Sequence, residues 1–294
     1  MATLRWTVGS NCNKQLLRFF LREQCYISRR ALADIKFNGG LILLNGNEVT
    51  VRAVVQEGDT VTISLPAEMV SESLSPENIP LHIIYEDEHL LVIHKEAGMP
   101  TIPSREHPTH TLANAVLGYY ENKKIPATFH AVNRLDKDTS GLLLVAKHRL
   151  AHDRLSKLQQ AGKVRRFYHA IVEGYLEKNV GTIQAPIGRD ESSIIARKVS
   201  EDGQYAITHY SVKLTTGEIT LVEIELETGR THQIRVHFSH LGHPLLGDDL
   251  YGGKRDRICR QALHCSRIEF EHPFEKRKQE FKLELPHDMK SLIE

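Results

Sequence analysis

Two carboxylates stand in a short polar segment that leads into an apolar one. Residues 133–141 read Asn-Arg-Leu-Asp-Lys-Asp-Thr-Ser-Gly and run directly into the apolar stretch 142–146. A polar segment that feeds a buried strand places its side chains at a sheet edge, where Asp136 or Asp138 could act as a nucleophile or general base. The alternative is that both aspartates only close a turn through side-chain-to-backbone hydrogen bonds. The residues alone leave both interpretations open.

A second polar segment, residues 228–237, reads Thr-Gly-Arg-Thr-His-Gln-Ile-Arg-Val-His. Gly229 permits a tight turn, and the alternation of polar and apolar residues after it predicts a strand over 234–238. Arg235 then lies on the polar face of that strand. An arginine in a half-buried strand needs an acidic partner or a phosphate, and Asp136 is a possible acidic partner.

Histidines are concentrated around the same segment. Four of them fall within twelve residues, namely His232, His237, His240 and His243. In a strand the first two point to opposite faces, and no cysteine or His-Glu-x-x-His pattern accompanies them, so we predict no metal site. The chain also has no Gly-x-Gly-x-x-Gly and no phosphate-binding Gly-Lys-Ser/Thr loop, so we expect no cofactor.

Local charge is more informative than net charge. The formal net charge is +1, from 38 Lys+Arg and 37 Asp+Glu, but residues 147–169 hold seven Lys/Arg against one acid. Within them, Lys163-Val-Arg-Arg-Phe-Tyr-His169 sets aromatic residues beside cations, as nucleic-acid surfaces do. A solvated helix face is the alternative explanation.

The overall composition is that of an ordinary globular protein. A chain of 294 residues suffices for one large domain, or for a medium domain and a small one. No stretch approaches the about 18 apolar residues of a membrane span, and the first residues lack the apolar core of an export signal. The four cysteines form no Cys-x-x-Cys pair, which disfavours a disulfide framework. We therefore expect a cytoplasmic protein without a membrane partner.

Residues 1–66 have the pattern of a small αα-βββ domain. Apolar residues over 16–21 recur at helical spacing, and a second helix is expected to begin at Ser28. Two strands follow, over 41–44 and 60–65, with an Asn-Gly turn after the first. Residues 67–80 are rich in Ser, Glu and Pro and are predicted to be a linker.

Residues 81–290 form the second predicted domain. Helices are expected over 111–120 and 148–160. Strands are expected over 81–85, 90–94, 141–146, 168–172, 206–214, 219–226 and 234–238. Because many strands follow one another without intervening helices, the fold class is α+β with a mixed, largely antiparallel sheet.

The motifs, in their order along the chain, resemble those of the RluA-type pseudouridine synthases. The main match is the segment 133–147, which is similar to the family's His-Arg-Leu-Asp-x-x-Thr-Ser-Gly signature. Further similar segments are 85–95, 167–174, 228–237, 242–248, 261–264 and 272–273. The resemblance extends from about residue 80 to residue 286. Residues 1–65 resemble, more weakly, the RNA-binding module of the ribosomal-protein-S-four type.

The resemblance implies roles for particular residues. Asp136 matches the catalytic aspartate, Tyr168 the tyrosine that stacks on the base, and Arg235 the basic residue paired with that aspartate. Arg134 matches the arginine that enters the RNA when the target nucleotide leaves its stack. We expect the substrate-binding residues to be Arg134, Lys147, Arg165, Arg166, Arg230 and His232.

The implied activity is the isomerisation of uridine in ribosomal or transfer RNA, with no cofactor, no metal and no obligate protein partner. Two positions depart from the family: Asn133 stands where many members have His, and Glu96 stands where Pro often follows the lysine. The alternative is a non-catalytic RNA-binding protein that retains the fold, for which Asn133 is the best support. The presence of Asp136, Tyr168 and Arg235 together argues against it.

Overall fold

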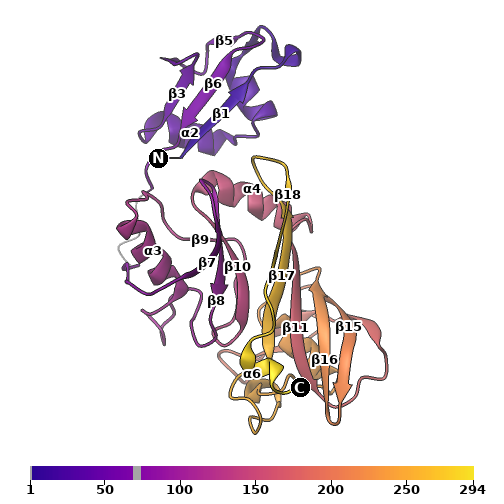
Figure 1. Cartoon of the computed structure of the whole chain (residues 1–294). Helices are drawn as coiled ribbons and strands as arrows, with labels where there is room; N and C mark the ends of the chain where they lie inside the picture. Colours follow the sequence, from indigo (N-terminus) through magenta and orange to yellow (C-terminus); the bar gives the residue numbers. More distant parts are fainter. Residues whose placement is uncertain (1, 69–73) are drawn as a thin grey trace.

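The N-terminal module, residues 2–65, is built on a four-stranded antiparallel sheet (Figure 1). The computed structural model describes residues 2–68 and 74–294. The strand order is β1-β6-β3-β4, formed by β1 (Thr3–Thr7), β6 (Thr60–Ser64), β3 (Leu41–Leu44) and β4 (Asn47–Glu48). A separate short pair joins β2 (Gln15–Leu16) to β5 (Val54–Val55).

The helices of this module agree with the prediction only in part. The second, α2 (Arg29–Phe37), begins where predicted, because the Ser28 hydroxyl accepts a hydrogen bond from the Ala31 N–H at 3.2 Å. The first is a short α1 (Leu17–Phe19) that continues as a π-helical turn over Phe20–Gln24. The order αα-βββ was incomplete, since the module begins with β1, a strand that was not predicted.

The second sheet has ten strands and contains the core of residues 81–290. Its main path is β12-β15-β16-β11-β17-β10-β8-β7, with β18 paired to β17 and β9 to β10. These strands are β7 (His82–Glu86), β8 (Leu90–Lys95), β9 (His130–Ala131), β10 (Ser140–Ala146), β11 (Arg165–Glu173), β12 (Val180–Gln184), β15 (Ile207–Thr216), β16 (Ile219–Leu226), β17 (Leu263–Glu271) and β18 (Lys278–Lys282). A separate hairpin joins β13 (Ile187–Arg189) to β14 (Arg197–Val199). The predicted α+β class with a mixed, largely antiparallel sheet is confirmed.

The two halves of the large sheet meet where β10 lies parallel to β17. Every other pair in this sheet is antiparallel, and the parallel contact spans only two residue pairs, Ser140 with His264 and Gly141 with Cys265. Gly141 has φ +118°, and a Cβ at this position would collide with the Cys265 carbonyl oxygen. The glycine that ends the polar segment 133–141 is therefore required for the halves to join.

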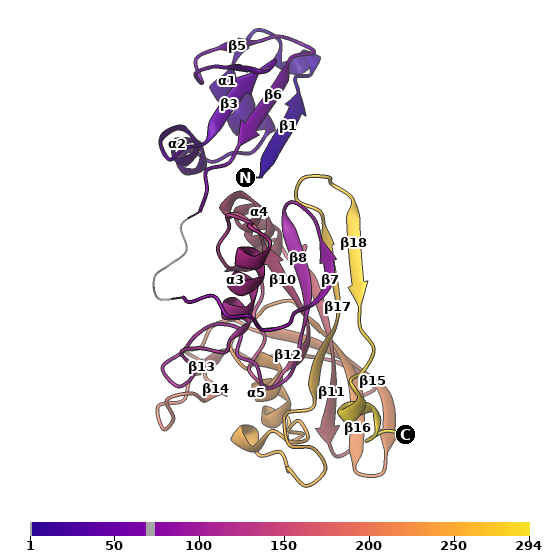
Figure 2. The ribbon, with the colours of Figure 1, turned by 60° about the vertical axis from the view of Figure 1, so that its left-hand side comes forward.

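The helices of this part of the chain, in the residues described, are α3 (Leu112–Asn122), α4 (Arg149–Gln160), α5 (Gln233–His240) and α6 (His287–Lys290), of which Figure 2 labels the first three. A short 3-10 turn lies at Asp249–Tyr251 here and another at Ser10–Cys12 in the N-terminal module. Thr111 and Asn114 form a reciprocal capping box at the start of α3. The predicted helices over 111–120 and 148–160 are confirmed.

The strand predicted over 234–238 is wrong, because this segment lies in α5. All six residues from Gln233 to Phe238 are buried, so this part of the helix has no solvent-facing side to give it a helical polarity pattern. Its polar side chains are instead satisfied internally: the Gln233 amide donates to the Ile207 carbonyl at 2.9 Å, and the His237 ring contacts the Thr208 hydroxyl at 2.8 Å. The alternation of polar and apolar residues over 234–238 therefore does not indicate the two faces of a strand.

The N-terminal module contacts the larger part of the chain through α4 (Figure 1). Leu150 belongs to the same buried apolar cluster as Leu17 and Leu21 of the module. Arg154 donates hydrogen bonds to the Cys25 carbonyl of the module and, at 2.8 Å, to the Pro273 carbonyl. Part of the predicted linker, residues 69–73, lies outside the described residues. No helix in residues 2–68 and 74–294 is both long and apolar enough to cross a membrane.

Candidate active site

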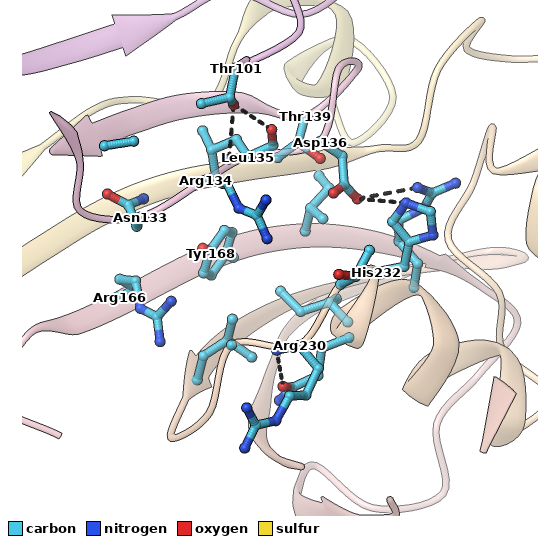
Figure 3. A pocket seen from close by; sticks show the side chains of 18 of the residues that line it. Thr101, Asn133, Arg134, Leu135, Asp136, Thr139, Arg166, Tyr168, Arg230 and His232 are labelled. Carbon is cyan, nitrogen blue, oxygen red and sulfur yellow. Dashed lines mark hydrogen bonds and ion pairs between the residues drawn. The ribbon is translucent and has the colours of Figure 1, made fainter. Parts of the chain in front are cut away.

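A cavity of about 570 Å³ opens where the two halves of the large sheet meet. Its lining comes from three segments: the loop before β10, the start of β11, and the turn that leads into α5 (Figure 3). Seven of the nine predicted site residues line it, namely Arg134, Asp136, Arg166, Tyr168, Arg230, His232 and Arg235. The two other predicted residues, Lys147 and Arg165, do not.

Arg235 is held between two carboxylates. Its guanidinium donates to Asp136 Oδ2 at 3.2 Å, and to both oxygens of Asp248 at 2.7 and 2.8 Å. The Asp248 side chain is fully buried and that of Arg235 nearly so, whereas Asp136 is partly exposed toward the cavity. Burial acts to lower the pKa of Arg235, but the hydrogen bonds to Asp248 and the charge of Asp136 raise it above its usual value. Asp248 thus fixes the arginine, and the arginine faces Asp136.

His232 approaches the same carboxylate oxygen of Asp136 as Arg235 does. Its Nε2 lies 3.9 Å from Asp136 Oδ2, and its Nδ1 lies 2.7 Å from the Tyr251 hydroxyl. That hydroxyl oxygen accepts a hydrogen bond from the Arg197 N–H, so its own proton is free to be donated to His232 Nδ1. The remaining ring proton then sits on Nε2, toward Asp136. Burial lowers the pKa of His232, which favours the neutral ring.

His232 also has an unusual backbone conformation. It caps α5 with φ +59°, in the left-handed region that residues other than glycine rarely adopt. The strain is sustained by the hydrogen bonds around it, among them that from the Arg230 N–H to the Gln233 side-chain oxygen at 2.9 Å. The turn therefore directs the imidazole into the cavity.

The loop that carries Asp136 is held by two buried side chains. Thr101 Oγ1 donates to the Leu135 carbonyl at 2.6 Å. The Lys95 ammonium donates to three carbonyls, those of Glu96, Met99 and Lys137, at 2.8 to 2.9 Å. Burial lowers the pKa of Lys95 to about 7, while the carboxylates of Asp136 and Asp138 act to raise it.

The turn itself is closed by backbone, with the Thr139 N–H donating to the Asp136 carbonyl at 3.1 Å. The Asp136 carboxylate pairs with Arg235 instead. Within residues 2–68 and 74–294, neither aspartate side chain closes the turn, so the alternative raised from the sequence is not what the fold contains.

Tyr168 and Arg166 stand on β11 and reach into the cavity together (Figure 3). Tyr168 is 4% exposed, and burial raises its pKa above the usual value, so the phenol stays neutral. The Arg166 guanidinium lies against Gly229, where a Cβ would be 2.8 Å from its Nη1. The glycine of the turn thus makes room for the arginine.

Asn133 and Arg134 occupy the loop before Leu135 in different ways. Asn133 is buried, and its Oδ1 accepts a hydrogen bond from the Leu144 N–H at 2.8 Å, which ties the loop to β10. Arg134 is exposed at the mouth of the cavity. Asn133 therefore supports the loop by a hydrogen bond that an unprotonated histidine nitrogen could also accept.

Lys147 and Arg165 lie outside the cavity and are paired with acids. Lys147 contacts Glu86 at 2.8 Å, and Arg165 contacts Glu225 and Glu269 at 2.8 and 2.9 Å. Their charges are therefore largely balanced within the chain. Their expected role in substrate binding stays a prediction that the site geometry does not favour.

Sequence reasoning missed Asp248, Lys95 and Tyr251. Asp248 ends the segment 242–248 and could have been noted as a second acid for Arg235. Lys95 ends a strand whose first four residues are apolar, which is a weaker signal. Tyr251 follows Asp248 within one turn, and the sequence alone has no feature that links it to His232.

Metal-ligating side chains gather at one place away from this cavity. His82, His94 and Glu96 each offer a ligand atom within 4.8 Å of the others, on the outer hairpin of β7 and β8. The four histidines from His232 to His243 do not converge on one point; His237, for example, is buried between the Thr208 hydroxyl and the Ala185 carbonyl.

Comparisons with known proteins identify the family to which the chain belongs. Residues 89–240 match the family model described as RNA pseudouridylate synthase. The chain belongs to this family, and the resemblance to its RluA-type members is confirmed. Its members are isomerases.

Three similar proteins illustrate the relationship. A Bacillus subtilis protein named as an uncharacterized RNA pseudouridine synthase, YjbO, is 52% identical over 267 residues, 91% of this chain and 94% of the relative. The ribosomal large subunit pseudouridine synthase D of Pseudomonas aeruginosa is 39% identical over 269 residues, 86% of this chain and 83% of the relative. The solved structure of human RNA pseudouridylate synthase domain containing 1 has a TM-score of 0.58 and 27% identity, covering 70% of this chain and 83% of that one.

Proposed function

We propose that this chain converts uridine to pseudouridine in structured ribosomal or transfer RNA, with Asp136 as its catalytic carboxylate. One observation carries the assignment: among the described residues Asp136 is the one carboxylate that lines the cavity, its Oδ2 faces Arg235 and His232, and Tyr168 is on the wall. A ribosome-bearing compartment, the cytoplasm, is the location that suits such a substrate.

The reaction needs one anionic carboxylate in a site that excludes most water. The glycosidic bond from C1′ to N1 breaks, the uracil turns, and a bond forms from C1′ to C5. Asp136 can take part by attacking the sugar or the ring, or by removing a sugar proton, and all three routes need it ionised. The positive charge of Arg235, fixed by Asp248, stabilises that negative charge.

The remaining residues suit the capture of a flipped nucleotide. Removing a base from its stack costs roughly a few kcal/mol, which stacking and cationic contacts must offset. Tyr168 offers a buried aromatic face, and Arg134 and Arg230 offer positive charge at the cavity. We propose that Arg134 fills the place that the base leaves.

The test compares two neighbouring carboxylates. We expect Asp136→Asn to fold and bind RNA but to release no tritium from RNA labelled at C5 of uridine, because isomerisation displaces that hydrogen. Asp138→Asn is the matched control, since it removes a carboxylate from the same loop and should leave the rate within a few-fold of wild type. Tritium release by Asp136→Asn at the wild-type rate would refute the assignment.

The RNA is identified separately. Mapping pseudouridine across total RNA from cells with and without the gene should reveal sites that depend on it. The name of the Pseudomonas aeruginosa relative, a ribosomal large subunit synthase, supports looking first in ribosomal RNA. If every dependent site lay in RNA other than ribosomal or transfer RNA, this part of the proposal would be contradicted.

A further inference from the structure

Arg166 is a buried cation that lacks a partner. It is 6% exposed, and its guanidinium has no hydrogen bond or ion pair within the described part of the chain. Arg235, the other buried arginine of the described residues, is paired with two aspartates. Arg154 is only half-buried, and its two Nη atoms donate to carbonyls. Arg166 is therefore the exception.

This exception has an energetic meaning. A guanidinium cannot lose its proton under ordinary conditions, so burial cannot be relieved by neutralisation. A buried charge without a counter-charge or hydrogen bonds is strongly destabilising. A fold that keeps Arg166 in this state, with Gly229 leaving room for it, is suited to a ligand that completes its hydrogen bonds.

Asn133 adds a second unused donor to the same cavity lining. Its Oδ1 accepts from the Leu144 N–H, which fixes the amide so that Nδ2 is the free end. Nδ2 is buried and has no acceptor within the residues described. The outer nitrogens of Arg166 therefore offer hydrogen-bond donors to this end of the cavity, with the enclosed amide of Asn133 as a further donor in the same wall, and the ligand it fits must bring acceptors.

The position of these donors indicates which part of the substrate they meet. In Figure 3, Arg166 and Asn133 lie at the end of the cavity opposite Asp136 and His232, and Tyr168 stands between the two ends. If the sugar lies at Asp136 and the base on Tyr168, the edge of the base remote from the sugar points toward Arg166. A backbone phosphate is a poorer fit, because it would remain near the exposed mouth, whereas Arg166 is buried.

We propose that Arg166, supported by Asn133, binds a carbonyl oxygen of the target uracil and stabilises the negative charge that develops there. This inference rests on the proposed function. When the bond from C1′ to N1 breaks, its electron pair stays on the uracil and is delocalised onto O2 and O4. The pair at C5 then forms the new bond to C1′, and the C5 hydrogen leaves as a proton. Cytosine carries an amino group in place of O4, so its hydrogen-bond donor would face the donors of Arg166 and Asn133 and would be disfavoured.

The test is a double-mutant cycle in which one change is made at Arg166 of the enzyme and the other at a carbonyl oxygen of the target uridine. The RNA is a short stem-loop that carries the uridine found by the mapping above, made with uridine, 2-thiouridine or 4-thiouridine at that position. Sulfur is a weak hydrogen-bond acceptor, so replacing the contacted oxygen should slow the wild type. Single-turnover rates at saturating enzyme are measured for wild type, Arg166→Met and Arg166→Lys.

We expect Arg166→Met to slow the uridine substrate by about 10- to 100-fold, the range of a hydrogen bond to a charged group. Replacing the contacted oxygen with sulfur should slow Arg166→Met much less than it slows the wild type, because the variant has already lost the contact to that oxygen. Arg166→Lys should recover part of the rate.

Arg257→Met, which removes a surface charge paired with Glu218, is the control and should change none of these ratios. Equal slowing of all three substrates by Arg166→Met would indicate a phosphate or structural contact and would overturn the inference, as would an unchanged rate. A wild type that releases no tritium from the mapped RNA would instead refute the proposed function, and this inference with it.

Discussion

At the scale of single residues, Arg235 connects two carboxylates that would otherwise repel each other. It holds the fully buried Asp248 with two hydrogen bonds and Asp136 with one. The bidentate pair fixes the guanidinium plane, and the single bond leaves the second oxygen of Asp136 available to a substrate. Asp248 therefore sets the position of the Arg235 guanidinium, and the charge of Arg235 acts on Asp136.

We predict that Arg235→Met slows turnover severely while RNA affinity changes little. The variant also loses on the order of 3–5 kcal/mol of stability, because Asp248 is left buried without its counter-charge. Arg235→Lys should recover part of the rate, since it restores the charge without the bidentate geometry. Urea unfolding measures the loss of stability, and single-turnover kinetics at saturating enzyme measures the change in turnover.

Asp248→Asn is the companion variant, because it weakens the anchor while Arg235 keeps its charge. We expect a lower free energy of unfolding and a smaller fall in rate than for Arg235→Met. Should Arg235→Met react at the normal rate once all the RNA is bound, Arg235 is only a binding residue and the proposed pairing with Asp136 has no catalytic role.

At the scale of elements, α4 begins at a histidine that must stay neutral. His148 caps the helix by accepting a hydrogen bond from the Ala151 N–H on Nδ1, and its Nε2 lies 3.0 Å from His89 Nδ1. Burial and, to a smaller extent, the neighbouring His89 lower the pKa of His148 to about 3. A protonated ring would lose the acceptor that the cap requires.

Because the folded pKa of His148 lies below the unfolded value of about 6.5, the unfolded chain binds a proton first as pH falls. The contribution of the neutral His148 to the free energy of unfolding is therefore complete above pH about 6.5. It is lost progressively below that pH, by about 2 kcal/mol at pH 5. His148→Asn should keep a cap and reduce this pH dependence. Urea unfolding of both proteins at pH 7 and pH 5 is the measurement; identical slopes with pH would contradict the prediction.

At the scale of the whole molecule, the N-terminal module is joined to the catalytic part through α4. Leu150 packs into the core of the module, and Arg154 reaches from α4 to the Cys25 carbonyl while stacking 4.2 Å from the centroid of the Phe274 ring. The module thus packs against α4, a helix that lies within the basic segment 147–169.

We predict that deleting residues 1–70 weakens RNA binding and lowers its salt dependence while the ten-stranded sheet stays folded. Each phosphate contact on single strands contributes about 0.7 to the slope of log affinity against log salt. Affinity measured over a salt series gives the slope, and circular dichroism reports the fold. An unchanged slope would mean that this module does not bind RNA.

Arg154→Met in the full-length chain distinguishes the effect of how the N-terminal module is attached from the effect of its presence. It keeps the module but removes both carbonyl hydrogen bonds, so any loss of affinity then reflects how the module is held. We expect this loss to be smaller than that of the deletion.

Sequence patterns predicted most of these elements but not the packing between them. The helices α2 and α4 carry local caps, at Ser28 and His148, and the apolar run of β10 is continuous, so local rules suffice for them. The helix α5 was mistaken for a strand because burial on all sides removes the polarity pattern that marks a helix. The strand β1 is short and only partly buried, with one fully buried residue, Leu4.

The candidate site shows the same division. The contact of Arg235 with Asp136 joins residues 99 apart, and it could be suggested because a buried arginine needs an acid and the family resemblance names one. The roles of Lys95 and Asp248 depend on which carbonyls and carboxylates the finished fold brings to them. No local pattern in the sequence encodes those distances.

The parallel contact of β10 with β17 has a consequence for the order in which a functional molecule appears. β17 lies between β11 and β10, although it follows them by about a hundred residues in the chain. While the polypeptide is being synthesised from its N-terminus, Asp136 and Tyr168 are made long before the strand that must separate and align them. Loop closure over such a span is slow, and it cannot begin until Leu263–Glu271 is free to insert. A nascent chain that already displays its basic segment can therefore attract RNA, but it has no assembled pocket in which to modify a nucleotide.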